Sequence, residues 1–515
     1  MTQSEVKTIL SRPRVIVVGA GIGGLTAAIG LATRGCDVTL LEREAAPGGK
    51  MRQLTVDGRA IDAGPTVFTM RWVFEQVFAE AGARLDEHVR LSPASILARH
   101  AWSADQRLDL FADIDRSEAA IAAFAGPAEA RGFRAFCRAA SRAYATLEGP
   151  FIKSALPSML GLAAAVGNPV NLLSIRPFAT LWSELGSHMR DPRLRQLFGR
   201  YATYCGSSPF LAPATLMLVA DVEQQGVWFI DGGMHALARA LADLATARDV
   251  DLRYGAEVAE ITASNRISGV RLASGETLAA DAVVVNADPQ AVATGRLGRD
   301  VSRAIPRRDH AERSLSALTW AGLARATGFP LQHHTVFFSS DYKAEFDQLG
   351  RGSVPAEPTV YVCAQDRDDR ECEPDGLERL LILINAPPTG DTHAFTQTEI
   401  DQCRQRAFRL MQRCGLTLTE TTLTATSPTA FDRLFPATGG ALYGPAVHGS
   451  TASFKRPGSR TAIKGLYLAG GATHPGAGVP MAALSGRLAA SALMADLAST
   501  PPSRATAMSG GMSTR

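Results

Sequence analysis

The hydrophobic pattern near the start of the chain predicts a β-strand, a helix and a second strand. Residues 15–18 are consecutively apolar, which is typical of a strand buried on both faces. The Ala- and Leu-rich stretch 25–32 predicts a helix, and residues 38–41 predict the second strand. Glycines separate the first strand from the helix, and Glu42 directly follows the second. This order predicts a βαβ unit of a parallel sheet.

Later parts of the chain carry patterns that return to the same sheet. Residues 250–285 predict short strands with hairpin turns. The last of these strands runs into Asn286 and is expected to rejoin the first sheet. Residues 466–469 and 481–493 predict a further strand and helix of this sheet. The intervening segments are helical in pattern at 133–146 and 191–204, and strand-like at 380–385.

These patterns predict the α/β fold class, with a Rossmann-like dinucleotide-binding domain interleaved with a mixed α+β substrate domain. The first domain is expected to contain residues 14–69, 225–290 and 455–498. The second is expected to contain residues 70–224 and 291–454. The remaining residues, 499–515, are rich in Ser, Pro and Gly and predict a disordered tail.

Each glycine of the first turn has a predicted role. Gly19 allows a tight turn out of the strand, and Gly21 lets a pyrophosphate approach the backbone. Gly24 lets the helix pack closely against the sheet. The phosphates then face the free N–H groups and the positive end of the helix dipole. Glu42 is placed to accept hydrogen bonds from an adenosine ribose and to repel a 2′-phosphate.

Composition narrows the function classes. A chain of 515 residues with 46% hydrophobic and 20% charged residues is expected to form more than one globular core. A net charge of +3 without a Lys/Arg run argues against nucleic-acid binding. Seven cysteines without a C-x-x-C pair, and the absence of a signal-peptide pattern, predict reduced cytoplasmic thiols. No metal is expected, and His333 and His334 are interpreted as a surface feature of a loop or strand.

Motifs after the first βαβ unit carry a family resemblance. Gly48, Gly49 and Lys50 follow Glu42, and the segment 61–66 follows in turn. Together with the glycine-rich segments 465–471 and 473–481, they resemble the flavin-dependent amine oxidase and carotenoid desaturase superfamily. The resemblance implies FAD rather than NAD as the cofactor.

The resemblance also implies which residues contact FAD. The Gly-Gly turn and the residues after it would lie along the pyrophosphate, ribitol and flavin, and the C-terminal motif would face the ribitol and the pyrimidine edge of the flavin. Val258 would pack a backbone amide against adenine. The implied cofactor-binding residues are Gly19, Ala20, Gly21, Ile22, Gly23, Gly24, Glu42, Arg43, Gly49, Lys50, Met51, Gly64, Pro65, Thr66, Val258, Asn286, Gly470, Gly471, Gly478, Val479, Pro480 and Met481.

Three segments, 226–233, 334–337 and 473–480, look like the bacterial phytoene-desaturase-type carotenoid desaturases, over the chain from about Arg14 to Leu497. The continuation 479–486 resembles the hydroxyneurosporene (methoxyneurosporene) desaturase group of purple photosynthetic bacteria. This implies an FAD-dependent enzyme of carotenoid biosynthesis that introduces a C-3,4 double bond into an acyclic 1-hydroxy or 1-methoxy C40 carotenoid. Hydride transfer to flavin N5 and proton loss would form the bond, with oxygen or a quinone as the final electron acceptor. The alternatives are a phytoene desaturase, a carotenoid isomerase, or a non-catalytic prenyl-binding escort protein.

No catalytic residue is assigned. Four polar residues are expected near the flavin, and a structural role is favoured for each. Asp62 is expected to bond backbone N–H groups in its own turn, and Asp231 to cap a helix that starts near Met234. Tyr443 is the third, and His474 is either a base or a residue that packs beside the flavin.

The stretch from Ser154 to Ile175 has no charged residue. Its prolines and glycines argue against a spanning helix, because bilayer hydrocarbon cannot satisfy a broken helix backbone. This segment is expected to form a monotopic contact with the inner membrane, so that the protein is cytoplasmic and peripherally bound to that membrane. A buried wall of a substrate tunnel and a plain core segment are the alternatives.

Overall fold

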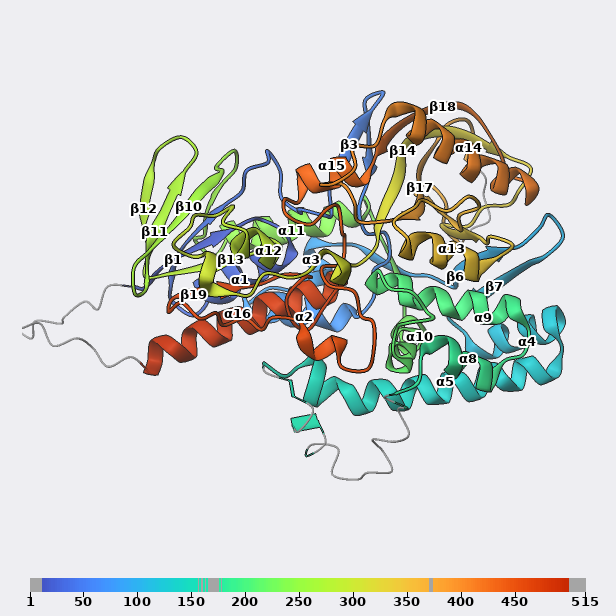
Figure 1. Ribbon diagram of the computed structural model, residues 1–515, viewed down its shortest axis with the longest axis horizontal. Helices are drawn as coiled ribbons and strands as arrows, with labels where there is room; N and C mark the ends of the chain where they lie inside the picture. The colour runs from blue at the N-terminus through green and yellow to red at the C-terminus, as the bar shows by residue number, and fades with distance from the viewer. Residues whose placement is uncertain are drawn as a thin grey trace, which may run out of the picture.

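The computed structural model describes residues 12–155, 157–158, 161–162, 164, 176, 178–369 and 374–499 (Figure 1). Its first sheet has five parallel strands. The order across the sheet is β19 (Leu466–Leu468), β13 (Ala282–Val285), β1 (Arg14–Val18), β2 (Asp37–Leu41) and β9 (Asp251–Arg253). β13 and β19 therefore join the βαβ unit, as the sequence predicts.

Both faces of this sheet are covered, which explains the continuous apolar run of β1. Val15 and Val17 pack in the cluster formed with α1 (Ile22–Ala32), α11 (Met234–Thr246) and α16 (Val479–Ser499). Ile16 and Val18 alternate with them and pack in the cluster under a small antiparallel sheet. Its strands are β10 (Val258–Ala263), β11 (Ile267–Leu272) and β12 (Thr277–Ala279). The result is a three-layer arrangement, seen at the left of Figure 1.

α16 is the one helix in the described part of the chain that is long and apolar enough to cross a membrane. It packs against α1, where Thr26 Oγ1 donates to the carbonyl of Ala483 at 3.1 Å. A Cβ on Gly486 would lie 2.2 Å from the carbonyl oxygen of Gly23. Such close backbone contact identifies α16 as a core helix.

The second sheet has seven strands, antiparallel except where β15 pairs with β6. Leu380, Ile382 and Ile384 of β17 pack with α14 (Gln397–Arg413), whereas Leu381 and Leu383 line a cavity on the opposite face. This alternation makes the sheet one wall of the cavity. The strand order is β18 (Thr417–Thr426), β14 (Ser316–Thr327), β17 (Glu378–Ala386), β16 (Val360–Ala364), β15 (His334–Phe337), β6 (Ile96–Ala101) and β7 (Arg107–Phe111).

A helical layer forms another wall. Its core holds Phe133, Phe136 and Phe198, and the Phe136 and Phe198 rings lie 5.1 Å apart. Helix α5 (Pro127–Leu147) runs along the lower edge of Figure 1. The elements are α4 (Ile114–Ala125), α5 (Pro127–Leu147), η1 (Glu148–Ile152), α8 (Leu181–His188), α9 (Pro192–Gly199), η2 (Arg200–Cys205), η3 (Ala214–Met217) and α10 (Leu218–Gln224).

The remaining elements are short and connect these layers. They are β3 (Gln53–Val56), β4 (Arg59–Asp62), α2 (Arg71–Glu80), α3 (Leu85–His88), β5 (Leu91–Pro93), β8 (Trp228–Ile230), α12 (Pro289–Ala293), η4 (Ser302–Ala304), η5 (His310–Glu312), α13 (Tyr342–Gly350), α15 (Pro428–Leu434) and η6 (Ala452–Lys455).

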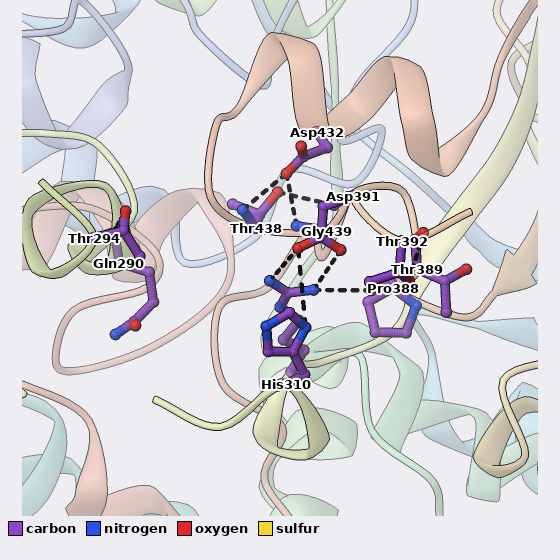
Figure 2. A network of polar contacts seen from close by, with 12 residues as sticks. Gln290, Thr294, His310, Pro388, Thr389, Asp391, Thr392, Asp432, Thr438 and Gly439 are labelled. Carbon is purple, nitrogen blue, oxygen red and sulfur yellow. Dashed lines mark hydrogen bonds and ion pairs between the residues drawn. The ribbon is translucent and has the colours of Figure 1, made fainter. Parts of the chain in front are cut away.

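A polar junction holds the loop between α15 and the cavity (Figure 2). Arg313 donates to both carboxylate oxygens of Asp391 at 2.8 Å. Asp432 Oδ1 accepts from the backbone N–H groups of Thr438 at 3.0 Å and of Gly439 at 2.7 Å. These bonds fix the segment that continues to the cavity wall.

The structure adds to the sequence prediction in three places. β6 and β7 are strands in a region for which the sequence predicts no element, because β6 mixes Arg99 and His100 with apolar residues. The β3–β4 hairpin, which lies within residues 14–69 of the expected cofactor domain, also packs Val56 and Ile61 against the seven-stranded sheet. Ser499 belongs to α16, and the rest of the predicted tail, 500–515, lies outside the described residues.

Candidate functional site

The glycine turn between β1 and α1 leaves the start of the helix open. Gly21 occupies the N-cap position of α1, and no side chain caps the helix. A Cβ on Gly24 would lie 2.0 Å from the carbonyl oxygen of Gly19, so only glycine permits this approach. The uncapped N–H groups of Ile22, Gly23 and Gly24 are the kind of site that binds phosphate.

Glu42 joins the turn to the end of β2. Its Oε2 accepts from the N–H of Ala20 at 2.7 Å, and its Oε1 accepts from the N–H of Glu44 at 2.9 Å. Each carboxylate oxygen retains a further lone pair for a ribose hydroxyl. The carboxylate therefore also holds the backbone of the turn, a role that the sequence did not indicate.

Asn286 lies at the centre of the glycine-rich segments. Its N–H donates to the carbonyl of Val18 at 2.8 Å, and its Nδ2 donates to that of Gly19 at 3.3 Å. A Cβ on Gly21, Gly23 or Gly470 would lie 2.6–2.7 Å from its side-chain amide. Three glycines from both ends of the chain thus surround one side chain.

The Gly48–Lys50 turn contacts the same place. The N–H of Gly48 donates to the carbonyl of Ala20 at 2.9 Å, and a Cβ on Gly49 would lie 3.2 Å from Gly21 Cα. A Cβ on Gly64 would lie 1.9 Å from the carbonyl oxygen of Lys50. The neighbouring Met51 is buried, and its carbonyl forms a 2.6 Å hydrogen bond with Nδ1 of His235.

The C-terminal motif is held by a buried arginine. Arg456 donates to the carbonyls of Gly471 at 2.9 Å and of Tyr443 and Pro445 at 3.0 Å. Burial lowers the pKa of Arg456 to about 10. The N–H of Gly470 donates to Ser485 Oγ at 3.1 Å. No motif in the sequence marks Arg456, because its partners are backbone carbonyls.

These segments open into one largely apolar cavity. Lys50 Nζ donates to the carbonyl of Leu442 at 2.5 Å, and burial lowers the pKa of Lys50 to about 8. Thr66 Oγ1 and the Tyr361 hydroxyl are 2.6 Å apart. The predicted cofactor residues that line the cavity are Lys50, Gly64, Pro65, Thr66, Gly478, Val479, Pro480 and Met481.

The other predicted cofactor residues do not line this cavity, and two of them, Arg43 and Val258, make contacts outside the glycine turns. Arg43 donates to the carbonyls of Arg433 and Leu434, beyond the end of β2. Val258 begins β10 and packs in the apolar cluster that contains Val18 and Leu41.

The roles expected for Asp62 and Asp231 are wrong. Asp62 accepts from Gln53 Nε2 at 2.9 Å and from the N–H of His235 at 3.4 Å, rather than from its own turn. Asp231 is exposed and does not cap α11, whose N-cap is Gly233 without a side-chain bond. A Cβ on Gly233 would lie 2.3 Å from Asp62 Oδ2, so the aspartate from β4 occupies the capping position instead.

Tyr443 and His474 differ in their access to the cavity. Tyr443 lines it, and burial raises the pKa of Tyr443 to about 12. His474 forms a 2.9 Å hydrogen bond with the carbonyl of Ser154 and packs its ring against Phe151. Burial lowers the pKa of His474 to about 4, which makes it a weak base. These contacts describe a packing residue.

The interpretation of His333 and His334 as a surface feature is wrong. His334 is buried in β15, and its Nδ1 lies 2.7 Å from the Tyr361 hydroxyl. His333 Nδ1 forms a 2.8 Å hydrogen bond with the carbonyl of Arg367, and Nε2 lies 3.6 Å from Cys363 Sγ. Ligand atoms of the two histidines and Cys363 lie within 4.8 Å of one another. Hydrogen bonds already account for both Nδ1 atoms.

The residues present fit a bound dinucleotide. The turn between β1 and α1 is a cradle that a Cβ on Gly21 or Gly23 would fill. The site also has the other features that dinucleotide binding requires: an uncapped helix N-terminus for phosphate, a carboxylate for ribose and a second glycine motif beside the cavity.

Comparison with known proteins agrees with this geometry. Residues 22–494 match the family described as flavin containing amine oxidoreductase. The chain is 56% identical over 509 residues to a hydroxyneurosporene desaturase of Rubrivivax gelatinosus, covering 98% of this chain and 97% of that protein. It is 49% identical to a protein of the same name from Cereibacter sphaeroides, covering 95% of this chain and 98% of the relative.

A solved structure shows the same fold. An oxidoreductase from Methanosarcina mazei superposes with a TM-score of 0.59 at 16% identity, covering 94% of this chain and all of that chain. From the family match and the relatives together, the chain belongs to the flavin-containing amine oxidoreductase family and is an FAD-dependent oxidoreductase.

Proposed function

We propose that this protein is a carotenoid desaturase that introduces the C-3,4 double bond into an acyclic 1-hydroxy or 1-methoxy carotenoid. The names of the relatives at 56% and 49% identity support this substrate class. The observation that carries the proposal is the cavity. Its walls come from the seven-stranded sheet and from α5, α10 and η1, and its lining, which includes residues of the flavin motifs, is mainly apolar.

The chemistry follows from the substrate class. A polyene has no acidic proton within reach of side-chain pKa values, so hydride loss precedes proton loss. When bound, FAD supplies the hydride acceptor. The residues of the chain orient the polyene and exclude water, which is where their contribution to the rate lies. In this proposal, the proton leaves from the adjacent carbon, and oxygen or a quinone accepts the electrons.

The product spectrum tests the proposal. Purified FAD-loaded protein given 1-hydroxyneurosporene is expected to produce a red-shifted absorption, because a new double bond extends the conjugation. Phytoene is expected to react little. A site built to bond the oxygen rejects a hydrocarbon by up to roughly 10⁴-fold.

Other outcomes would point to the alternatives. Comparable conversion of phytoene would indicate a phytoene desaturase. A product of unchanged mass would indicate an isomerase, and protein purified without flavin would favour an escort role.

We also propose that the protein binds peripherally to the cytoplasmic face of the inner membrane, where such substrates dissolve. Most of the segment from Ser154 to Ile175 lies outside the described residues, and Leu162 within it lines the cavity. Phe178, three residues beyond it in the sequence, is 82% exposed, and Leu211 is 54% exposed. The loops that carry these two residues are joined by 2.8 Å backbone hydrogen bonds, such as that from Ala214 N to the carbonyl of Ala179. Two large exposed apolar side chains therefore lie on paired loops, one of which closely follows the apolar segment in the sequence.

Replacing Phe178 and Leu211 with aspartate is expected to release the protein from phosphatidylglycerol-containing vesicles. Each apolar side chain in the bilayer contributes about 1.5–3 kcal/mol, so vesicle affinity falls by at least roughly tenfold per residue. Pelleting and flavin content are the measurements. Tyr254→Asp is the control, because Tyr254 is also exposed but follows β9 of the five-stranded sheet. Unchanged pelleting of the double variant would support the tunnel-wall or core interpretation.

A further inference from the structure

A buried polar cluster interrupts the apolar wall of the cavity. It consists of Arg200, Tyr201 and Tyr204 of η2 and Glu223 of α10, and we call it the Arg200 cluster. Arg200 Nη1 donates to the Tyr204 hydroxyl at 2.8 Å. The hydroxyls of Tyr204 and Tyr201 donate to the two carboxylate oxygens of Glu223 at 2.5 and 2.7 Å. One cation and one carboxylate are thus connected through tyrosines.

Arg200 retains unused donors. Its side chain lines the cavity and is 7% exposed, and within the described residues Nε and Nη2 have no hydrogen-bond partner. A guanidinium carries several N–H donors and no acceptor, and a buried donor without a partner is destabilising. Glu223 is already bonded by both tyrosines. The cluster is therefore internally complete except for the free edge of the guanidinium.

The groups around Arg200 do not supply the missing acceptor. Burial, together with the nearby charge of Arg200, lowers the pKa of His100 and His334 well below the usual range, so both are neutral. His100 Nδ1 is bonded to the carbonyl of Leu108, and His334 Nδ1 to the Tyr361 hydroxyl. Nε2 of His100 has no partner within the described residues either, so it does not accept from Arg200. The ring of Tyr204 holds the guanidinium in place, with Cζ 5.1 Å from its centroid.

The cluster lines the same cavity as the flavin motifs. Burial raises the pKa of Tyr361 on this cavity well above its usual range, and the charges of Tyr204 and Arg200 also act on it. The Tyr361 hydroxyl is in turn 2.6 Å from Oγ1 of Thr66, in the flavin motif. Arg200, Tyr204, Tyr361 and Thr66 all line the same cavity.

This placement matches the chemistry of the substrate. An oxygen on C1 lies within about 4 Å of C3, given bond lengths near 1.5 Å. A group that recognises this oxygen must therefore lie near the flavin, rather than at the distant end of the cavity.

We propose that Arg200 is the specificity-determining residue that recognises the oxygen on C1 of the substrate, through hydrogen bonds donated by its free guanidinium edge. The inference rests on the proposed function. Tyr201, Tyr204 and Glu223 are positioning residues. Because a guanidinium only donates, it bonds a hydroxyl and a methyl-ether oxygen alike, and it disfavours a hydrocarbon end that leaves it unpaired. The carboxylate of Glu223 offsets the positive charge, so hydride loss nearby is not opposed by an isolated cation.

The test uses the full-length FAD-loaded protein with neurosporene and its 1-hydroxy and 1-methoxy derivatives. The variant is Arg200→Met with Glu223→Gln, which removes the cation without leaving a buried carboxylate alone. We expect KM for both oxygenated substrates to rise about tenfold or more, corresponding to about 1.4 kcal/mol. The ratio of kcat/KM for the oxygenated substrates to kcat/KM for neurosporene should fall by the same factor. Binding of each carotenoid to the purified protein, followed by tryptophan fluorescence, should lose the same preference.

Controls keep the result interpretable. Arg193→Met, which removes an ion pair with Asp191 on α9 outside the cavity lining, should keep the wild-type preference. Arg200→Lys retains a donor and should keep part of the preference; it also serves if the double variant does not fold. The assignment of Arg200 is overturned if the double variant keeps the full wild-type preference while Arg193→Met is also unchanged. If only Arg200→Lys folds, full wild-type preference in that variant overturns the assignment in the same way. A wild-type protein that does not prefer the oxygenated substrates overturns the proposed function itself.

Discussion

Replacing Gly21 with valine is expected to abolish FAD retention while most of the fold remains. A Cβ at this position meets the side-chain amide of Asn286 at 2.6 Å, and this side chain can move. The rest of the valine projects over the start of α1, where the pyrophosphate must approach the backbone. Losing two charge-assisted hydrogen bonds of about 1.5–3 kcal/mol each weakens binding by roughly 10²–10⁴-fold.

Flavin absorbance per mole of purified protein, FAD titration and circular dichroism measure this effect. Gly350→Val is the matched control, because Gly350 is exposed and a Cβ there meets nothing within 4 Å. Gly24 is unsuitable as the test, since its Cβ would meet the backbone of Gly19 and disturb the fold itself. Normal flavin content in Gly21→Val would contradict the cofactor assignment.

Replacing Arg456 with methionine is expected to lower the free energy of unfolding by about 3–5 kcal/mol and to weaken FAD retention. The substitution leaves the carbonyls of Gly471, Tyr443 and Pro445 without their donor. Each orphaned buried carbonyl costs about 1–3 kcal/mol, partly offset because the buried cation is also removed. The C-terminal glycine motif then loses the side chain that orients it.

Denaturant unfolding and the release of flavin fluorescence on heating measure this loss. The matched control is Arg325→Met, which breaks an exposed ion pair with Glu420 and is expected to cost less than about 1 kcal/mol. Equal unfolding midpoints for Arg456→Met and the control would show that the three carbonyls find other partners.

The sequence predicts the elements whose requirements are local. The strand at β1 is buried on both faces and therefore reads as a continuous apolar run, and the turn after it needs glycine for steric reasons. β13 and β19 carry the same pattern and join the same sheet. The strands of the five-stranded sheet all fall within the ranges expected for the cofactor domain, and those of the seven-stranded sheet fall outside them.

The sequence misses elements that lack such a pattern. β6 is fully buried yet contains Arg99 and His100, because its polar groups are satisfied by neighbours such as Asp109 and the carbonyl of Leu108. The predicted cap at Asp231 is wrong for a related reason. The local spacing of Asp231 suits a cap, but the carboxylate of Asp62, from β4, occupies the start of α11 and accepts from the N–H of His235 there.

What the sequence by itself determined is the βαβ unit, the glycine turns and the family, since each depends on residues near one another in the chain. Only the tertiary structure decided that Asn286 packs among Gly21, Gly23 and Gly470, and that Arg456 holds the C-terminal motif. It alone placed the Arg200 cluster on the cavity wall. The physical reason is that a buried polar side chain needs a hydrogen-bond partner, but the local sequence does not indicate which residue that is. The tertiary fold supplies the partner from a segment far along the chain.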